Sequence, residues 1–271
     1  MRLLTSSDVA ALLGVSTGTV KRWSDDGRIE CVRTEGKHRR YTLESVERFR
    51  RSREGEAGQG PSFVDRLLGD EDVLGLQATL LEQRSRLGAW WRVAGWLGPE
   101  IDDLGRRWQD GRIGIVEEHL ASERLSRALG RCAESLPARP SAPRVLLATA
   151  EGEEHMLGLG LVEVCLKEGG WNVRWSGRRT PTGEMERMVN QGGMDAVVLS
   201  ASVVANRSVL AEQAAIVGRA CEKRGVQLVV GGRGEWPEPL SYGKVIRDFD
   251  GLRAWMAETE AAGRPAPQTM N

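Results

Sequence analysis

Residues 144–158 read RVLLATAEGEEHMLG, and they give the first indication of the fold of the C-terminal half. An apolar run typical of a buried β-strand ends at residue 150, and a polar loop with a single histidine follows it. Further strand-like runs alternate with helical patterns: the runs cover 171–177, 195–201, 226–232 and 244–247, and the helical patterns cover 155–168, 182–192, 206–224 and 250–262. This alternation predicts a flavodoxin-like α/β domain with a five-stranded parallel sheet.

The loop after the first strand carries the candidate ligand residues. Loops at the carboxyl ends of parallel strands meet, so we expect 150–158, 201–206 and 231–236 to lie together. His155 can ligate a metal through one ring nitrogen while Glu153 accepts a hydrogen bond from the other. One histidine cannot hold a bare zinc ion, which prefers four ligands, but it can hold a metal already chelated by a macrocycle. Gly158 lets a helix begin close to such a bulky ligand.

This segment resembles the cobalamin-binding domain of methionine synthase and the B12-dependent mutases. The family motif is Asp-x-His-x-x-Gly, Ser-x-Leu and Gly-Gly. Here it reads Glu153-x-His155-x-x-Gly158, then after 41 residues Ser200-Ala201-Ser202, then after another 28 Gly231-Gly232.

The resemblance implies that His155 is the lower axial cobalt ligand and that Ser200 lines a slot for the nucleotide tail of the cofactor. Gly231 and Gly232 would leave room for that tail. The chain departs from the motif twice, since Glu153 replaces Asp and Ser202 replaces an apolar residue.

The N-terminal segment has the pattern of a DNA-binding module. Residues 1–53 carry 12 Lys and Arg against 7 Asp and Glu, a net of +5 in a chain whose overall net charge is zero. A capping box over residues 5–8, followed by Ala10, Gly14 and Val20, predicts two short helices at a tight turn, the second over 16–24. Two β-like runs, 29–33 and 39–42, predict a hairpin.

The stretches SSDVAALLGVSTGTVKRWSDDGRI (6–29) and TEGKHRRY (34–41) resemble the DNA-binding domain of the MerR family. That resemblance implies a winged helix-turn-helix that binds double-stranded DNA as a dimer. The candidate DNA contacts lie on the second helix and on the hairpin: Thr17, Gly18, Lys21, Arg22, Lys37, His38, Arg39 and Arg40.

Residues 62–136 have helical spacing and predict a four-helix bundle. We expect helices at 62–69, 71–86, 88–110 and 112–134, the third with a break at Gly98-Pro99 as an alternative. Trp108 ends an apolar stripe on the third helix. On the fourth, the spacing of Ile115, Val116, His119 and Leu120 predicts a core-facing stripe with Glu118 at its edge, so that Glu118 and His119 form a buried pair.

The order of the three modules resembles the CarH/LitR group of B12-dependent photoreceptor repressors over nearly the whole chain. In that group the bundle carries Trp, nine residues and Glu-His, which Trp108, Glu118 and His119 match. The resemblance implies that these residues cap the upper face of adenosylcobalamin in a homo-oligomer, from dimer to tetramer, that represses operator DNA in the dark. Light would break the cobalt–carbon bond and dissociate the oligomer.

Three alternatives stay open. Many CarH-type proteins have His directly after the bundle Trp, where this chain has Gln109, and this favours a light-independent cobalamin sensor. The domain can also be imagined to hold another tetrapyrrole chromophore. The third alternative is a corrinoid enzyme. The DNA-binding head argues against it, so we expect a regulator and not an enzyme.

Composition sets the remaining limits for the 271 residues. No apolar run is long enough to span a membrane, residues 1–16 show no signal-peptide pattern, and the four cysteines are scattered, so we expect a cytoplasmic protein. We expect a DNA-binding domain at 1–53, a linker at 54–61, the bundle at 62–136, a second linker at 137–143, the α/β domain at 144–262 and a tail at 263–271.

Overall fold

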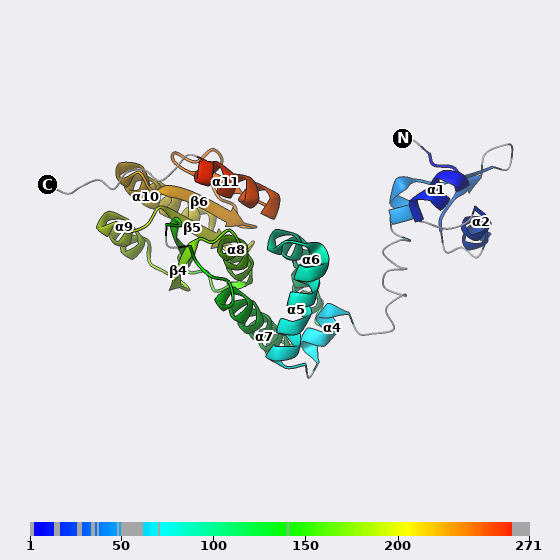
Figure 1. The fold of residues 1–271 in the computed structure, drawn as a ribbon, viewed down its shortest axis with the longest axis horizontal. Coiled ribbons are helices and arrows are strands. Elements are labelled where there is room, and N and C mark those ends of the chain that lie inside the picture. Colours follow the sequence, from blue (N-terminus) through cyan, green and yellow to red (C-terminus); the bar gives the residue numbers. More distant parts are fainter. Residues whose placement is uncertain are drawn as a thin grey trace. The chain divides into compact units, whose positions relative to one another are not determined.

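The computed structural model describes residues 3–13, 17–25, 29–33, 36, 38–47, 49, 62–69, 71–139 and 141–261. The chain divides into two compact units, Met1–Ser62 and Phe63–Asn271, which are drawn in Figure 1. Within the described residues, no helix is both long enough and apolar enough to cross a membrane.

The N-terminal unit contains the two predicted helices, α1 (Ser6–Leu13) and α2 (Thr17–Asp25). The predicted capping box is confirmed, because the Thr5 amide donates to Asp8 Oδ2 at 2.8 Å and the Asp8 amide donates to Thr5 Oγ1 at 3.2 Å. The hairpin strands β1 (Val32–Arg33) and β2 (Arg39–Arg40) are antiparallel and shorter than expected. A helical segment at 43–47, which was not predicted, adds Val46 to the core of this unit.

Four helices form the bundle of the second unit: α4 (Phe63–Leu68), α5 (Val73–Leu87), α6 (Trp90–Gln109) and α7 (Ile115–Glu134). The alternative of a break at Gly98-Pro99 is wrong, since α6 runs through Pro99. Pro99 lies on the exposed side of the helix, where solvent can bond the carbonyl that proline leaves without a donor.

The α/β part is a five-stranded parallel sheet in the order β4-β3-β5-β6-β7. Its strands are β3 (Arg144–Thr149), β4 (Asn172–Gly177), β5 (Ala196–Ala201), β6 (Gln227–Gly232) and β7 (Lys244–Ile246). The helices are α8 (Leu157–Glu168), α9 (Thr182–Gln191), α10 (Arg207–Arg224) and α11 (Phe249–Ala261). The flavodoxin-like prediction is therefore confirmed, and the strand order reverses between β3 and β5, where ligands bind in such sheets.

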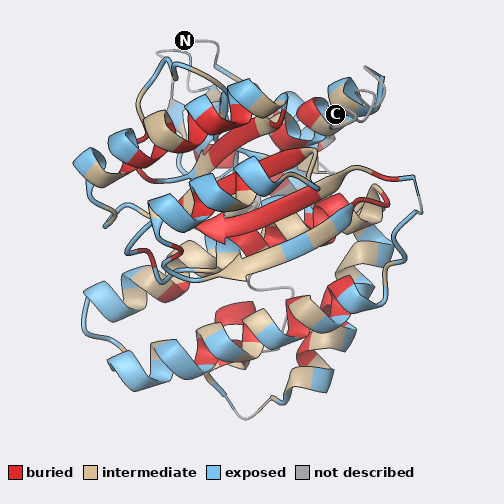
Figure 2. Cartoon of the chain, turned by 90° about the vertical axis from the view of Figure 1, so that its left-hand side faces the viewer, coloured by how far each residue is buried: buried red, intermediate tan, exposed pale blue. Residues whose placement is uncertain are grey.

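Alternate strand residues point to opposite faces and form two cores. Leu146 and Val197 pack with α9 and α10, whereas Val145 and Val198 pack with α8 and α11. The second core continues without interruption into the bundle, where it includes Leu125 of α7. Figure 2 shows buried residues concentrated in the sheet and on the inner faces of the helices that cover it. The bundle thus shares one hydrophobic core with the α8 side of the sheet.

Candidate functional site

The loops at the carboxyl edge of the sheet meet as predicted. The carboxylate of Glu153, in the loop after β3, accepts hydrogen bonds through Oε2 from the amide and the hydroxyl of Ser202, both at 2.7 Å. Ser202 lies in the loop after β5. The loop after β6 joins them, because the Gly234 amide donates to the Ala201 carbonyl at 2.9 Å.

Glu153 and His155 form the pair that the loop sequence predicted. Oε1 of Glu153 accepts from the backbone amide of His155 at 2.8 Å and lies 2.5 Å from its Nδ1. The Glu153 side chain is 1% exposed and that of His155 is 65% exposed. The carboxylate is thus buried beneath an imidazole whose Nδ1 is engaged from below, which leaves Nε2 for a ligand at the surface.

The electrostatics of the pair favour an ionised carboxylate. Burial alone would raise the pKa of Glu153, but the hydrogen bonds from His155 and Ser202 outweigh it and lower the pKa to about 2. The hydrogen bond with Glu153 raises the pKa of His155 above its usual 6.5, against the opposing effect of burial. Because the carboxylate is ionised, the neutral imidazole carries its proton on Nδ1.

The two departures from the cobalamin motif contact each other. The longer Glu153 side chain reaches Ser202, and the Ser202 hydroxyl supplies a hydrogen bond that the motif's apolar residue could not. The buried carboxylate therefore has four donors, two from His155 and two from Ser202. Sequence reasoning treated the replacements separately and missed this link, although their shared edge of the sheet was the available signal.

The structure brings together Gly158, Ser200 and Gly232. A Cβ built on Gly158 would lie 3.7 Å from Ser200 Oγ, and one built on Gly232 would lie 3.0 Å from the same atom. Gly232 has a φ of 80°, and its Cβ would also collide with the Ala201 carbonyl; a Cβ on Gly231 would lie 2.7 Å from the Ile246 carbonyl. The fold itself therefore demands Gly231 and Gly232, whereas it does not demand Gly158.

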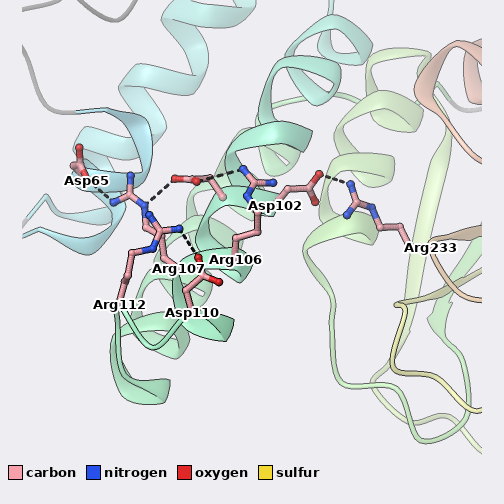
Figure 3. A network of polar contacts seen from close by, with 8 residues as sticks. Asp65, Asp102, Arg106, Arg107, Asp110, Arg112 and Arg233 are labelled. Carbon is pink, nitrogen blue, oxygen red and sulfur yellow. Dashed lines mark hydrogen bonds and ion pairs between the residues drawn. The ribbon is translucent and has the colours of Figure 1, made fainter. Parts of the chain in front are cut away.

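The third loop is also linked to the bundle. Arg233, directly after the Gly-Gly pair, forms an ion pair with Asp102 of α6. The next residue of α6, Asp103, binds Arg107, which reaches Asp65 of α4 at 2.6 Å. Figure 3 shows this row of contacts from the sheet edge across α6 to α4.

The expected core stripe on α7 is wrong. Ile115, Val116 and Leu120 are exposed, and the His119 side chain is 69% exposed, because α7 buries a stripe that begins only at Ala121. Glu118 and His119 are therefore not a buried pair; their Oε2 and Nε2 atoms are 3.7 Å apart near the surface.

Several large apolar side chains on both sides of the α6–α7 connection are exposed. Trp108, at the end of α6, is 45% exposed, and three apolar side chains of α7 are exposed beside it in the chain. The charge of Glu118 contributes to the raised pKa of His155, so the first turn of α7 lies within electrostatic reach of the His155 loop. The structure thus leaves the apolar side chains at the start of α7 uncovered within electrostatic reach of the candidate ligand histidine, and Trp108 exposed at the end of α6.

The N-terminal unit presents several of the predicted DNA contacts to solvent. Thr17, Gly18 and Lys21 are exposed on α2, and His38 is exposed beside β2. Two of the remaining candidates, Arg39 and Arg40, are half-buried on β2, while Lys37 and the side chain of Arg22 lie outside the described residues.

Comparison with known protein families agrees with this organisation. Residues 3–54 match the family described as Helix-turn-helix domain, and residues 143–242 match the B12 binding domain family. The HTH-type transcriptional repressors CarA and CarH of Myxococcus xanthus are each 33% identical to this chain, over 106 and 112 residues that cover 39% and 41% of it. The matches span only 35% and 36% of those repressors.

A solved structure supports the fold. The monomethylamine corrinoid protein of Methanosarcina barkeri superposes with a TM-score of 0.55 at 16% identity, covering 72% of this chain and 96% of that one. The chain therefore joins a helix-turn-helix domain to a B12-binding domain, is homologous to the two Myxococcus repressors, and has the fold of a corrinoid protein.

Proposed function

We propose that the chain is a transcriptional repressor that binds operator DNA through its N-terminal unit under the control of bound cobalamin. The Glu153–His155 pair at the carboxyl edge of the sheet is the observation that carries the proposal. It combines an exposed imidazole nitrogen with a buried ionised partner, which is what axial ligation of a chelated metal requires. The helix-turn-helix match argues for a regulator and against an enzyme.

The residues present fit such a cofactor. His155 Nε2 would be the lower axial ligand of cobalt. Glu153, itself bound by Ser202, would hold the imidazole ring of His155 in place. Gly158, Ser200 and the Gly231-Gly232 pair would border the slot for the nucleotide tail. A Cβ on Gly158 would make an ordinary van der Waals contact with Ser200 Oγ, at 3.7 Å, so the fold alone tolerates a side chain here and a bound ligand would account for the glycine.

Trp108, Glu118 and His119 would form the cap over the opposite face of the corrin. The exposure of Trp108 and His119 supports this role: Trp108 offers an aromatic surface, and His119 and the half-buried Glu118 offer polar contacts for ribose hydroxyls. Covering the apolar side chains here would favour the ligand-bound arrangement by about 25 cal/mol for each Å² removed from water. A cofactor that binds this arrangement better shifts the chain toward it.

Adenosylcobalamin would supply a cobalt–carbon bond that visible light breaks, which makes light the proposed input. The cap would contact the adenosyl group in the dark and lose that contact after illumination. We assign the DNA-bound form to a homo-oligomer, dimer to tetramer, acting in the cytoplasm, and the illuminated form to its dissociation.

A light-independent cobalamin sensor is the second candidate. Gln109 follows Trp108 and is exposed, so the position next to the cap tryptophan offers an amide and no imidazole. Of the three histidines in the chain, His119 alone lies on the cap. If light is the input, position 109 could not supply a histidine to the cofactor, and His119 is the histidine of the cap that could contact it.

The test is a pair of visible spectra and a DNA-binding assay. Full-length protein is mixed with adenosylcobalamin in the dark, desalted, and measured before and after green light, with His155→Ala as the control. A retained corrin spectrum that changes on illumination, together with loss of operator binding, supports the photoreceptor. A retained spectrum with light-independent DNA binding supports the cobalamin sensor, and no retained corrin refutes the assignment of His155.

A further inference from the structure

Two side chains hold carbonyl oxygens at the end of β6 and in the loop that follows it. The indole N–H of Trp236 donates to the Gly231 carbonyl at 2.8 Å. The guanidinium of Arg247 donates through Nη1 to the Gly232 carbonyl at 3.2 Å and to the Gly234 carbonyl at 2.7 Å. Three carbonyls of the segment Gly231–Gly234, which ends β6 and begins the following loop, therefore have a side-chain donor.

Burial orients the first donor, and an ion pair at the surface orients the second. Trp236 is buried in the core on the α9 and α10 face of the sheet, so packing determines the direction of its N–H. Arg247, which directly follows β7, pairs with Glu238, with Nη2 to Oε1 at 2.5 Å and Nε to Oε1 at 3.1 Å. A glycine backbone has the greatest conformational freedom of any residue, so external donors of this kind restrict it strongly.

The path of this loop sets one wall of the slot described above. Gly232 has a φ of 80° and lies beside Ser200 Oγ, which in turn faces Gly158. If the Gly232 backbone moved, its separation from Ser200 would change, and so would the width available between these residues. His155 takes no part in these three hydrogen bonds. The wall of the slot is therefore held by Trp236 and Arg247, whereas the proposed axial ligand is held by Glu153.

We propose that Trp236 and Arg247 are positioning residues that hold the Gly231–Gly234 loop as the wall of the nucleotide-tail slot. They would thereby determine the preference of the chain for a corrinoid that carries a nucleotide tail over one that lacks it. This inference rests on the proposed cobalamin function and assigns specificity within it.

The experiment compares two corrinoids with the same upper ligand, cobalamin and cobinamide, the latter being the same ring without the nucleotide tail. Each is titrated into the full-length wild type and into Trp236→Phe and Arg247→Ala, with the absorbance change giving Kd. Loss of these hydrogen bonds should weaken cobalamin binding about tenfold and leave cobinamide binding nearly unchanged. Arg247→Lys, which keeps the charge and one donor, should lie between wild type and Arg247→Ala.

Trp255→Phe is the matched control. Its indole N–H donates to the Gln227 side chain at 2.6 Å, at the opposite end of β6, so this variant also loses a hydrogen bond from a buried tryptophan. It should lose stability as Trp236→Phe does and keep the wild-type ratio of the two Kd values. Thermal melts of every variant establish that it is folded at the temperature of the titrations.

The outcomes separate the inference from the proposed function. A reduced preference for cobalamin in both test variants but not in Trp255→Phe supports the inference. If the ratio of the two Kd values stays at its wild-type value in the test variants, the inference is overturned, although cobalamin binding by the wild type still stands. A wild type that binds neither corrinoid refutes the proposed function, and the inference with it.

Discussion

Gly158→Ala should have opposite effects on folding and on cofactor binding. Gly158 is the second residue of α8 and its new Cβ would lie 3.7 Å from Ser200 Oγ, an ordinary van der Waals separation. The ligand-free protein should therefore gain about 0.5 kcal/mol, since alanine loses less backbone entropy in a helix than glycine. The same methyl group would occupy the space between α8 and Ser200 into which the tail is proposed to pass.

The loss of affinity follows from overpacking. Forcing one extra carbon into a filled site costs about 1–3 kcal/mol, which is a roughly 5- to 150-fold increase in Kd for cobalamin. Urea denaturation measures the change in stability of the ligand-free protein, and an absorbance titration measures the change in Kd for cobalamin. Gly183→Ala is the matched control, because Gly183 is the second residue of α9 and has nothing within 4 Å of its Cβ position. Wild-type cobalamin affinity in a folded Gly158→Ala protein would show that the tail does not pass between α8 and Ser200.

Three further predictions concern the buried carboxylate and the DNA-binding unit. Ser202→Ala removes one donor from buried Glu153 and should cost about 1–3 kcal/mol in urea denaturation, whereas Ser208→Ala, on the exposed start of α10, should cost little. Because the folded pKa of Glu153 is lowered from 4.5 to about 2, its contribution of up to about 3 kcal/mol is complete above pH 4.5 and is lost as the pH falls toward 2. Over that range the wild type should lose stability more steeply than Glu153→Gln, and parallel curves would contradict this. Lys21→Ala should weaken binding to operator and non-operator DNA alike and reduce the salt slope by about 1, an effect that Lys223→Ala on α10 should lack.

The parts of the site that could be predicted depend on short-range patterns. Glu153 and His155 are two residues apart at the end of a recognisable strand, so their contact follows from local geometry. The meeting of the three loops follows from parallel strands alone. Ser202 could be placed at the same edge, but its bond to Glu153 depends on side-chain length and rotamer, which no pattern in one sequence specifies.

The error on α7 has a different physical origin. Apolar residues at helical spacing predict a buried face only if another element covers that face. Ile115, Val116 and Leu120 satisfy the spacing, yet the core of α7 begins at Ala121. A surface kept apolar for a ligand has the same sequence pattern as a surface buried by the fold, and the structure is needed to tell them apart.

The contacts of α6 show how each end of this helix is held. Glu168 of α8 accepts from the Trp90 amide at 2.8 Å and from Arg84 Nε at 2.6 Å, which anchors the start of α6 beside a buried core. Asp102, 12 residues or about 18 Å further along the helix, is tied to the sheet edge by Arg233. That ion pair is partly exposed and worth about 0.2–1 kcal/mol. A displacement of Trp108 that pivots about the Glu168 end must therefore also disturb the Arg107–Asp65 pair and the buried side chain of Leu104, and sliding the whole helix would disrupt the rest of the shared core as well.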